Sequence, residues 1–300
     1  MTDTPAISTH GLTKSYGSIR ALRGVDLDVR RGEIFGFLGP NGSGKTTTIR
    51  CLLDLIRPDA GMLRVLDFDP QLDSLAVRAR TGYLPGELRV DDSFTVEATF
   101  KFFGNLRGHT LDWNYVRELA ERFTLDLQLP VKNLSKGNKQ KVGVIQALMH
   151  RPELLMLDEP TSGLDPLMQR EVLNAIRAAR EAGATVFFSS HVLSEVEAIA
   201  DRVGIIRRGE VVEVAETQAL IERALRRVYV RFKQSSDLTA ITALPGVTLI
   251  SHDDTHCQLH VEGEMDRLIK TLATYPVGDL EIERTSLEEI FMTYYDEAQR

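Results

Sequence analysis

The segment GPNGSGKT at residues 39–46 constrains the fold of this chain more than any other part of the sequence. It satisfies the pattern G-x-x-x-x-G-K-[ST] and lies between a short apolar run, 32–38, and a stretch with helical character that ends near Arg57 and Pro58. Glycines let successive backbone N–H groups approach an anion closely, and the N-terminus of the following helix adds partial positive charge. The segment therefore predicts a strand, a phosphate-binding loop and a helix within an α/β fold.

Two side chains of this loop carry the chemistry of nucleotide binding. Lys45 supplies a full positive charge to the β- and γ-phosphates, and the Thr46 hydroxyl is a suitable ligand for Mg²⁺. A glycine-rich turn without a ligand is the weaker interpretation, because the flanking strand and helix are those that the motif requires. The residues predicted to surround the phosphates are Gly39, Pro40, Asn41, Gly42, Ser43, Gly44, Lys45, Thr46 and Thr47.

A second element supplies the groups that hydrolysis needs. The stretch LLMLDEP at 154–160 ends an apolar strand in two acids. Asp158 is placed to hold Mg²⁺, through water, and Glu159 to polarise the attacking water as general base. Taken alone, Asp-Glu-Pro is more often an ordinary turn at the end of a strand. Beside a phosphate loop, the catalytic interpretation is favoured.

The pattern of apolar residues predicts how the first domain, residues 1–217, is organised. Alternating apolar and polar residues over 25–30 indicate a strand with one buried face, and hence an antiparallel sheet at the start of the chain. Continuous apolar runs, such as 154–157 and 185–188, are typical of parallel strands covered by helices on both faces. The charged, helical pattern at about 88–151 predicts an inserted helical lobe.

A smaller domain is predicted for residues 218–300, after a linker helix at about 217–227. Its expected elements follow the order βαββαβ of a ferredoxin-like α+β domain, closed by a terminal helix at 286–297. The expected strands and helices are 228–232, 237–244, 247–251, 256–261, 265–274 and 280–283.

Composition limits the compartment and the class of partner. The two cysteines, Cys51 and Cys257, lie far apart and fit no paired-ligand spacing, which favours a reducing compartment such as the cytoplasm. We expect neither a signal peptide nor a membrane span, because the N-terminus lacks a basic and apolar pattern and the apolar runs are short. A net charge of −7 argues against a general nucleic-acid binder, so no nucleic-acid partner is expected.

Together these motifs resemble those of the ATP-binding cassette (ABC) ATPases, over about residues 6–215. The stretch LSKGNKQ at 134–140 is similar to the family signature, SGLD at 162–165 to its D-loop, and SSH at 189–191 to its switch-histidine motif. Tyr16 is similar to the aromatic residue that stacks on adenine, although without the resemblance an exposed loop tyrosine is an equally good interpretation.

The resemblance implies a mechanism in which two cassettes face each other head to tail and share each ATP. The signature of one copy then completes the site of the other, so that ATP joins the two copies and hydrolysis releases them. The catalytic residues implied are Lys45, Glu159 and His191, with Asp165 in the D-loop and Thr46 and Asp158 on Mg²⁺. The residues contributed by the opposite copy are Ser135, Lys136, Gly137 and Asn138.

This sequence departs from the family pattern in two places. The signature has Lys136 where glycine is frequent and Asn138 where glutamine is frequent, while Ser135 is kept. The family's Q-loop glutamine is replaced by Gly86, which has no side chain that could act as a ligand. One hypothesis is that Glu87 takes over the contact to Mg²⁺ or the water, and a surface acid in a turn is the equal alternative.

The resemblance also implies a membrane partner. The family contacts its integral membrane permease through the segment at 88–108, although some phenylalanines there belong to the core. The tail SLEEIFMTYY at 286–295 is similar to the tails of multidrug, antibiotic and sodium exporter ATPases. We therefore expect an ATP-hydrolysing exporter subunit that is cytoplasmic and peripheral on the inner face of the cell membrane.

Other functions are weaker interpretations of the same residues. A cassette that acts on ribosomes or DNA is expected to carry a second cassette or a long coiled coil, and neither is seen. A small-molecule kinase leaves the signature unexplained, and a regulator without turnover does not need Glu159 and His191. A metal site at His252, His256, Cys257 and His260 is rejected, because the stretch alternates like strands and the side chains would not share one helical face.

Overall fold

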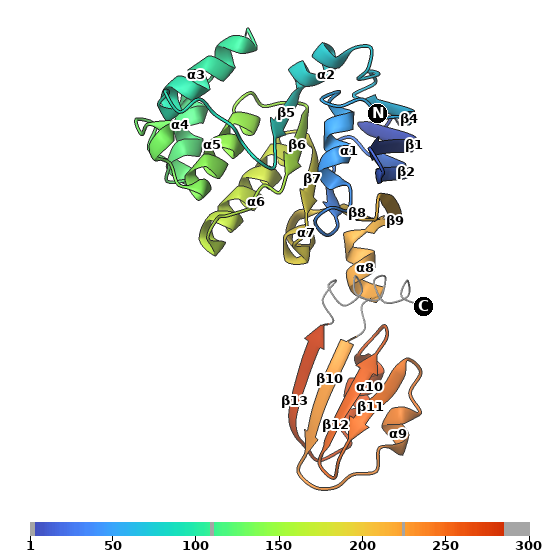
Figure 1. Ribbon diagram of the computed structural model, residues 1–300. Coiled ribbons are helices and arrows are strands. Elements are labelled where there is room, and N and C mark those ends of the chain that lie inside the picture. The colour runs from blue at the N-terminus through green and yellow to red at the C-terminus, as the bar shows by residue number, and fades with distance from the viewer. Residues whose placement is uncertain (1–3, 109–110, 224–225, 285–300) are drawn as a thin grey trace. The chain divides into compact units, whose positions relative to one another are not determined.

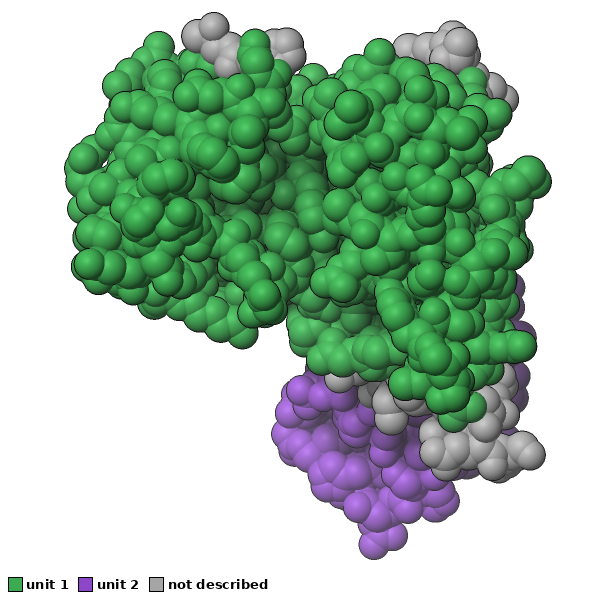
Figure 2. Space-filling model, turned by 45° about the horizontal axis from the view of Figure 1, so that its top comes forward, with its two compact units in different colours: residues 1–215 green, residues 216–300 purple. Residues whose placement is uncertain are grey.

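The computed structural model describes residues 4–108, 111–223 and 226–284. The chain divides into two compact units, Met1–Ala215 and Glu216–Arg300, which Figure 2 shows in green and purple. No helix among the described residues is both long and apolar enough to cross a membrane.

A three-stranded antiparallel sheet of unit 1 confirms the strand pattern predicted at the start of the chain. Its order is β2-β1-β4, with β1 at Ile7–Tyr16, β2 at Ile19–Val29 and β4 at Ala60–Val65. In β2 the residues Val25, Leu27 and Val29 are buried and alternate with exposed residues. The sheet thus buries one face against the core, as its period of two requires.

The second sheet of unit 1 brings the functional segments to one edge. Its order is β5-β6-β7-β3-β8-β9, and the pairs from β5 to β8 are parallel. Every residue of β3, β6 and β7 is buried, as expected of central parallel strands. The strand bounds are Ile34–Leu38 (β3), Thr81–Leu84 (β5), Leu154–Asp158 (β6), Thr185–Ser190 (β7), Arg202–Arg207 (β8) and Glu210–Glu216 (β9).

Helices pack around this sheet, as Figure 1 shows. Ile49 and Leu52 of the helix after the phosphate loop belong to the same buried cluster as Phe35 and Phe187 of the sheet. The helices are α1 (Lys45–Leu52), α2 (Ser74–Arg80), α6 (Pro166–Glu181) and α7 (Leu193–Ile199).

Helix α1 ends earlier than the sequence suggested. It stops at Leu52 rather than near Arg57, and Asp54 follows in the left-handed region with φ 49°. The N–H of Leu55 then bonds back to the carbonyl of Arg50 at 2.9 Å, which closes the helix end. Aspartate tolerates this conformation better than most residues, so the helix can end before Pro58.

The described residues of the segment predicted as a helical lobe form three α-helices and a short 3₁₀ turn. These are α3 (Val96–Leu106), α4 (Trp113–Arg122), η1 (Val131–Asn133) and α5 (Lys136–Leu148). Each α-helix begins at a side-chain cap, supplied by Thr95, Asp112 and Ser135. Phe100 is fully buried, whereas Phe102 is 45% exposed, so only some of the phenylalanines here serve the core.

Unit 2 has the βαββαβ order that the sequence predicted. Its antiparallel sheet has the order β11-β12-β10-β13, so that each βαβ unit encloses a strand of the other, as in a ferredoxin-like fold. The linker helix α8 ends at Arg223, earlier than expected, and β10 begins at Arg226. The helix predicted at 286–297 lies outside the described residues. The elements are α8 (Thr217–Arg223), β10 (Arg226–Phe232), α9 (Thr239–Thr242), β11 (Val247–His252), β12 (His256–Val261), α10 (Asp266–Leu272) and β13 (Val277–Arg284).

Candidate active site

Three neighbouring parallel strands end at a common pocket of unit 1. The phosphate loop follows β3, Glu159 follows β6, and His191 follows β7. Because the carboxyl ends of parallel strands meet at the same edge, segments more than 100 residues apart come together there. The pocket of about 360 Å³ is lined by Tyr16, Ala21, Pro40, Asn41, Gly42, Gly44, Lys45, Thr46, Thr47, Gly86, Asp158 and Glu159.

The backbone of the phosphate loop depends on its glycines. Gly44 has a φ of 116°, and a Cβ there would lie 2.9 Å from the carbonyl oxygen of Ala21. At Gly39 a Cβ would overlap with the carbonyl oxygen of Ile206 and lie 2.6 Å from Ser43 Oγ. The Ser43 hydroxyl is itself buried without a hydrogen-bond partner among the described residues. The loop therefore has a close backbone turn and a polar group available for an anion.

Lys45 is a buried cation at the centre of the pocket. Its side chain is only 5% exposed, and Nζ donates to the carbonyl oxygens of Gly39 at 2.5 Å and Pro40 at 3.1 Å. Nζ also lies 3.2 Å from Glu159 Oε1, which pairs the lysine with the acid that follows β6, two strands away from β3 in the sheet. The ammonium is thus held against the phosphate loop by two of its carbonyl oxygens, where it can neutralise the charge of a phosphate.

Asp158 is held by two hydroxyl groups. Thr46 Oγ1 donates to Asp158 Oδ2 at 2.7 Å, and Ser189 Oγ donates to Asp158 Oδ1 at 2.6 Å. The carboxylate is almost fully buried, and a Cβ at Gly86 would lie 3.0 Å from its Oδ2 atom. A carboxylate next to a hydroxyl is an oxygen donor set of the kind that Mg²⁺ prefers, so the residues fit this cation.

Glu159 links the lysine to the histidine. Its Oε2 atom lies 2.7 Å from His191 Nδ1, and its other oxygen faces Lys45. The backbone at Glu159 is in the left-handed region with φ 54°, and its N–H donates to Ser189 Oγ at 3.1 Å. A carboxylate fixed between a cation and an imidazole beside the phosphate loop can accept a proton from a water molecule.

Comparison with known proteins decides the family. A model of the family described as ABC transporter matches residues 22–162. The daunorubicin resistance ATP-binding protein DrrA3 of Streptomyces coeruleorubidus is 35% identical over 97% of this chain and 96% of its own length. The bacitracin transport ATP-binding protein BcrA of Bacillus licheniformis is 37% identical over 86% of this chain and 83% of its own.

This chain is an ABC transporter ATP-binding subunit. A solved ATP-binding subunit of an ABC transporter shares 27% identity, with a TM-score of 0.66 over 72% of this chain and 91% of that one. A dimeric ATP-binding cassette in a post-hydrolysis state, bound to ADP and Pi, shares the fold with a TM-score of 0.65 over 70% of this chain and 98% of that one, at 21% identity. The chain is accordingly an ATPase, and the comparisons give no support to a ribosome- or nucleic-acid-directed cassette.

The stretch that resembles the ABC signature, residues 134–140, lies around the start of α5, and none of its residues lines this pocket. Ser135 caps the helix by accepting from the N–H of Asn138 at 3.2 Å, and the side chain of Lys136 is exposed. A Cβ at Gly137 would lie 3.0 Å from the carbonyl oxygen of Gly163 in the D-loop. Within one chain the signature therefore contacts the D-loop rather than the phosphate loop.

Two further residues of the predicted site occupy well-defined places. Asp165 caps α6 by accepting from the N–H groups of Leu167 and Met168, both at 3.1 Å. Tyr16 lines the rim of the pocket, and its side chain is 46% exposed, so its ring is accessible to a base.

Glu87 is not brought to the pocket that Asp158 lines. Its side chain is 79% exposed, forms an ion pair with Arg89 at 3.4 Å, and borders a separate groove. Gly86 instead brings its main chain against Asp158. The two residues stand next to each other in a bend after β5 but border different hollows, so a shift of one position does not carry the ligand role to Glu87.

Two residues of the site were not singled out by sequence reasoning. Ser189 donates a hydrogen bond to Asp158 and accepts one from the N–H of Glu159. In the sequence it stands out only as part of the stretch SSH that contains His191. Gln140, the last residue of the quoted signature stretch, bonds to the carbonyl of Glu159. Both are neutral polar residues whose role depends on partners at least 19 residues away.

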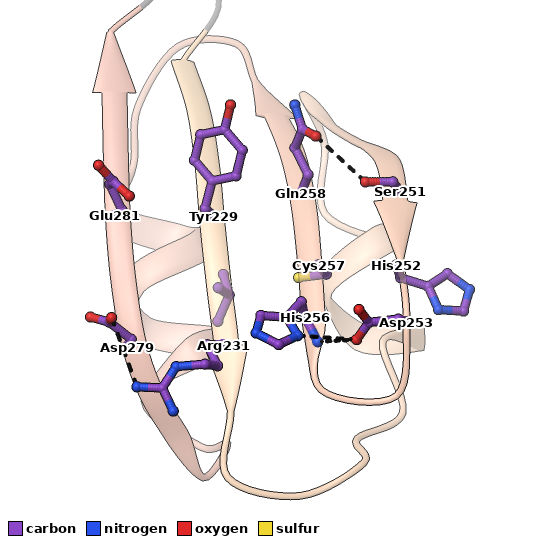
Figure 3. A pocket seen from close by; sticks show the side chains of 11 residues that line it. Tyr229, Arg231, Ser251, His252, Asp253, His256, Cys257, Gln258, Asp279 and Glu281 are labelled. Carbon is purple, nitrogen blue, oxygen red and sulfur yellow. Dashed lines mark hydrogen bonds and ion pairs between the residues drawn. The ribbon is translucent and has the colours of Figure 1, made fainter.

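A separate pocket of about 470 Å³ lies on unit 2 (Figure 3). His252 and His256 line it on adjacent strands, with His256 Nδ1 3.2 Å from Asp253 Oδ1. Cys257 also borders the pocket, but its side chain belongs to the buried core of this unit, where burial raises the pKa of its thiol to about 11. The sulfur and the two imidazoles thus lie in different environments.

Proposed function

We propose that this ABC ATP-binding subunit powers an exporter, using Mg²⁺-ATP to drive a separate permease from the inner face of the membrane. The observation that carries the proposal is the convergence of Lys45, Asp158, Glu159 and His191 at the ends of three adjacent parallel strands. Two relatives that match 97% and 86% of this chain are named for daunorubicin resistance and for bacitracin transport. These names support export.

Each residue of the pocket has a role that follows from its position. Lys45 and backbone N–H groups within residues 41–47 hold the β- and γ-phosphates, and Tyr16 stacks on the adenine. Thr46 and Asp158 hold Mg²⁺, which supplies positive charge for the phosphate oxygens. Glu159 accepts the proton of the attacking water, and His191 orients Glu159 through the contact of 2.7 Å.

The signature residues support a site shared between two copies. None of the residues that line the pocket comes from this stretch, which comprises Ser135, Lys136, Gly137 and Asn138. The first turn of α5 contains no acidic residue. A helix N-terminus of this kind favours an anion such as a γ-phosphate. In a head-to-tail dimer, the nucleotide held by one copy meets the signature of the other, with Asp165 beside the shared boundary.

A groove of about 560 Å³ supports a site for the permease. It lies where α1, β5, α3 and α5 border one another, and it combines Arg50, Arg78 and Arg107 with the apolar side chains of Leu55 and Phe103. A partner segment with an apolar face and acidic side chains would complement it. The groove includes Phe103 and Arg107, which lie in the segment expected to contact the permease.

The proposal is tested by replacing the base. Glu159→Gln should bind ATP but lose hydrolysis by at least about 100-fold, because the amide cannot accept the proton. With ATP and Mg²⁺ the variant should elute as a stable dimer in size-exclusion chromatography. Glu181→Gln, at an exposed position of α6, is the matched control and should behave like the wild type. A Glu159→Gln protein that stays monomeric with saturating ATP would argue against the shared site.

A further inference from the structure

Gln140 is a buried polar residue of the signature helix that the roles above do not use. It lies on α5, five residues after the capping Ser135, and only 7% of its surface is exposed. A buried amide is costly unless its hydrogen bonds are made, so the partners of this side chain show what it does.

The partners of Gln140 are the carbonyl groups of two consecutive residues in the turn that follows β6. Its Nε2 atom donates to the carbonyl oxygen of Glu159 at 2.9 Å and to that of Pro160 at 3.0 Å. One side chain therefore uses both of its N–H groups on the main chain of the proposed base and of the residue that follows it.

The main chain of Glu159 needs such support. Its φ of 54° places a non-glycine residue in the left-handed region, which persists only where the surroundings impose it. On one side, the N–H of Glu159 donates to Ser189 of β7, at 3.1 Å to Oγ and 3.2 Å to the carbonyl oxygen. On the other side, Gln140 holds the carbonyl. The peptide groups of Glu159 are thus fixed between the central sheet and the helical lobe.

A second contact joins the same two segments. Gly137, in the first turn of α5, approaches the carbonyl oxygen of Gly163 so closely that a Cβ would lie 3.0 Å from it. The start of α5 therefore packs against the loop that begins at Glu159 at two points. A displacement of the helix that carries the signature must move this loop or break these contacts.

We propose that Gln140 is a positioning residue that makes the placement of the Glu159 carboxylate depend on the position of the signature helix. The inference rests on the proposed function, in which Glu159 activates water and the signature binds the nucleotide of a second copy. Engagement of the signature by one nucleotide then adjusts the base that acts on the other. Gln140 couples the two shared sites through two hydrogen bonds within each chain.

The test compares steady-state ATP hydrolysis by the full-length chain with Gln140→Met, which keeps the length of the side chain but removes both donors. We expect kcat to fall about 10- to 100-fold, because the carboxylate is misplaced, while KM for ATP stays within about twofold. Gln140→Leu also removes both N–H groups and adds no charge to this buried position, so it should fall similarly. It provides a second variant if the first is poorly folded.

Thr9→Val is the matched control for lost stability. Thr9 is fully buried in β1, and its Oγ1 atom donates to the carbonyl oxygen of Val25 at 2.9 Å. The change therefore removes a bond of the same kind, away from Glu159. It should lower the melting temperature as Gln140→Met does but leave kcat unchanged.

A double variant separates positioning from a general structural role. In the Glu159→Gln background, Gln140→Met should cause no further loss of the single-turnover rate, because the group through which it acts is already gone. A further loss there, or a wild-type kcat in both Gln140 variants, would overturn the inference and leave the proposed function intact. Wild-type hydrolysis by Glu159→Gln alone would instead overturn the proposed function.

Discussion

Glu159 combines an unfavourable backbone conformation with a carboxylate that the site requires. Its backbone lies in a region that disfavours residues with a Cβ by about 1–2 kcal/mol, yet glycine cannot replace it because the carboxylate is needed. Its two oxygens face Lys45 and His191, and its N–H group faces Ser189. The cost of the conformation is offset by contacts that also direct the carboxylate.

Gly86 leads to a prediction at the same scale. In Gly86→Ala the new Cβ would lie 3.0 Å from Asp158 Oδ2, closer than such atoms normally approach, so the carboxylate must shift. We expect the affinity for Mg²⁺ during ATP hydrolysis to fall about 10-fold, as for other changes that displace a metal-binding side chain. Titration of the ATPase rate with Mg²⁺ measures this effect.

Glu87→Ala is the paired variant for that experiment. Its side chain is largely exposed and borders the other groove, so ATP turnover and Mg²⁺ dependence of the isolated subunit should stay at wild-type values. A loss of Mg²⁺ affinity in Glu87→Ala with none in Gly86→Ala would contradict the placement of these two residues.

The sequence identified the charged residues of the pocket and missed the neutral ones that hold them. Lys45, Asp158 and Glu159 stand in motifs whose spacing reflects their chemistry. Ser189 and Gln140 act on the main chain or on a buried carboxylate of a distant segment, and no local pattern encodes such a partner. For Glu87, sequence adjacency suggested a role that the direction of its side chain does not support.

At the scale of elements, Asp165 combines a place in the D-loop with the cap of α6. Asp165→Ala should lower the free energy of unfolding by about 1 kcal/mol, because two N–H groups lose their acceptor. Asp165→Ser keeps a capping oxygen and should retain nearly all of this stability. Urea unfolding followed by circular dichroism compares the two variants.

The rate of ATP hydrolysis then separates the cap from any role in the site. If both variants lose activity while only Asp165→Ala loses stability, the carboxylate acts in the shared site as well as on the helix. Equal losses of stability in the two variants would show that the cap contributes little.

Elements with continuous apolar runs were predicted well, whereas the ends of some helices and strands were predicted less well. The buried runs of β3, β6 and β7 are continuous and apolar, which left little ambiguity. The end of α1 depends on a left-handed Asp54, and the start of β10 on its pairing with β12 and β13. The apolar pattern shows neither, because the first is a local backbone conformation and the second depends on strands that are distant in the sequence.

At the scale of the whole molecule, each of the two units contains one buried cysteine, whose reactivity can be used to follow the unfolding of that unit. Cys51 is buried in unit 1 and Cys257 in unit 2, and burial raises the pKa of each thiol to about 11. At pH 8 only about one thiol in a thousand would then be ionised, compared with roughly a quarter in an unfolded chain with a pKa of about 8.5.

We therefore expect both cysteines to resist iodoacetamide at pH 8 in the native protein and to react once their own unit unfolds. Pulsed labelling along a urea titration, read by mass spectrometry of the two peptides, gives an unfolding curve for each unit. Rapid native labelling of either residue at pH 8 would contradict its burial.

Because the signature lies outside the pocket of its own chain, two different inactive variants can be expected to restore activity when they pair. Under the proposed head-to-tail pairing, a copy with a damaged Lys45 still lends an intact Ser135 to its neighbour. In a mixed pair of one copy lacking Lys45 and one lacking Ser135, both defects fall in the same composite site and the other site is whole. Two individually inactive alleles would then complement each other.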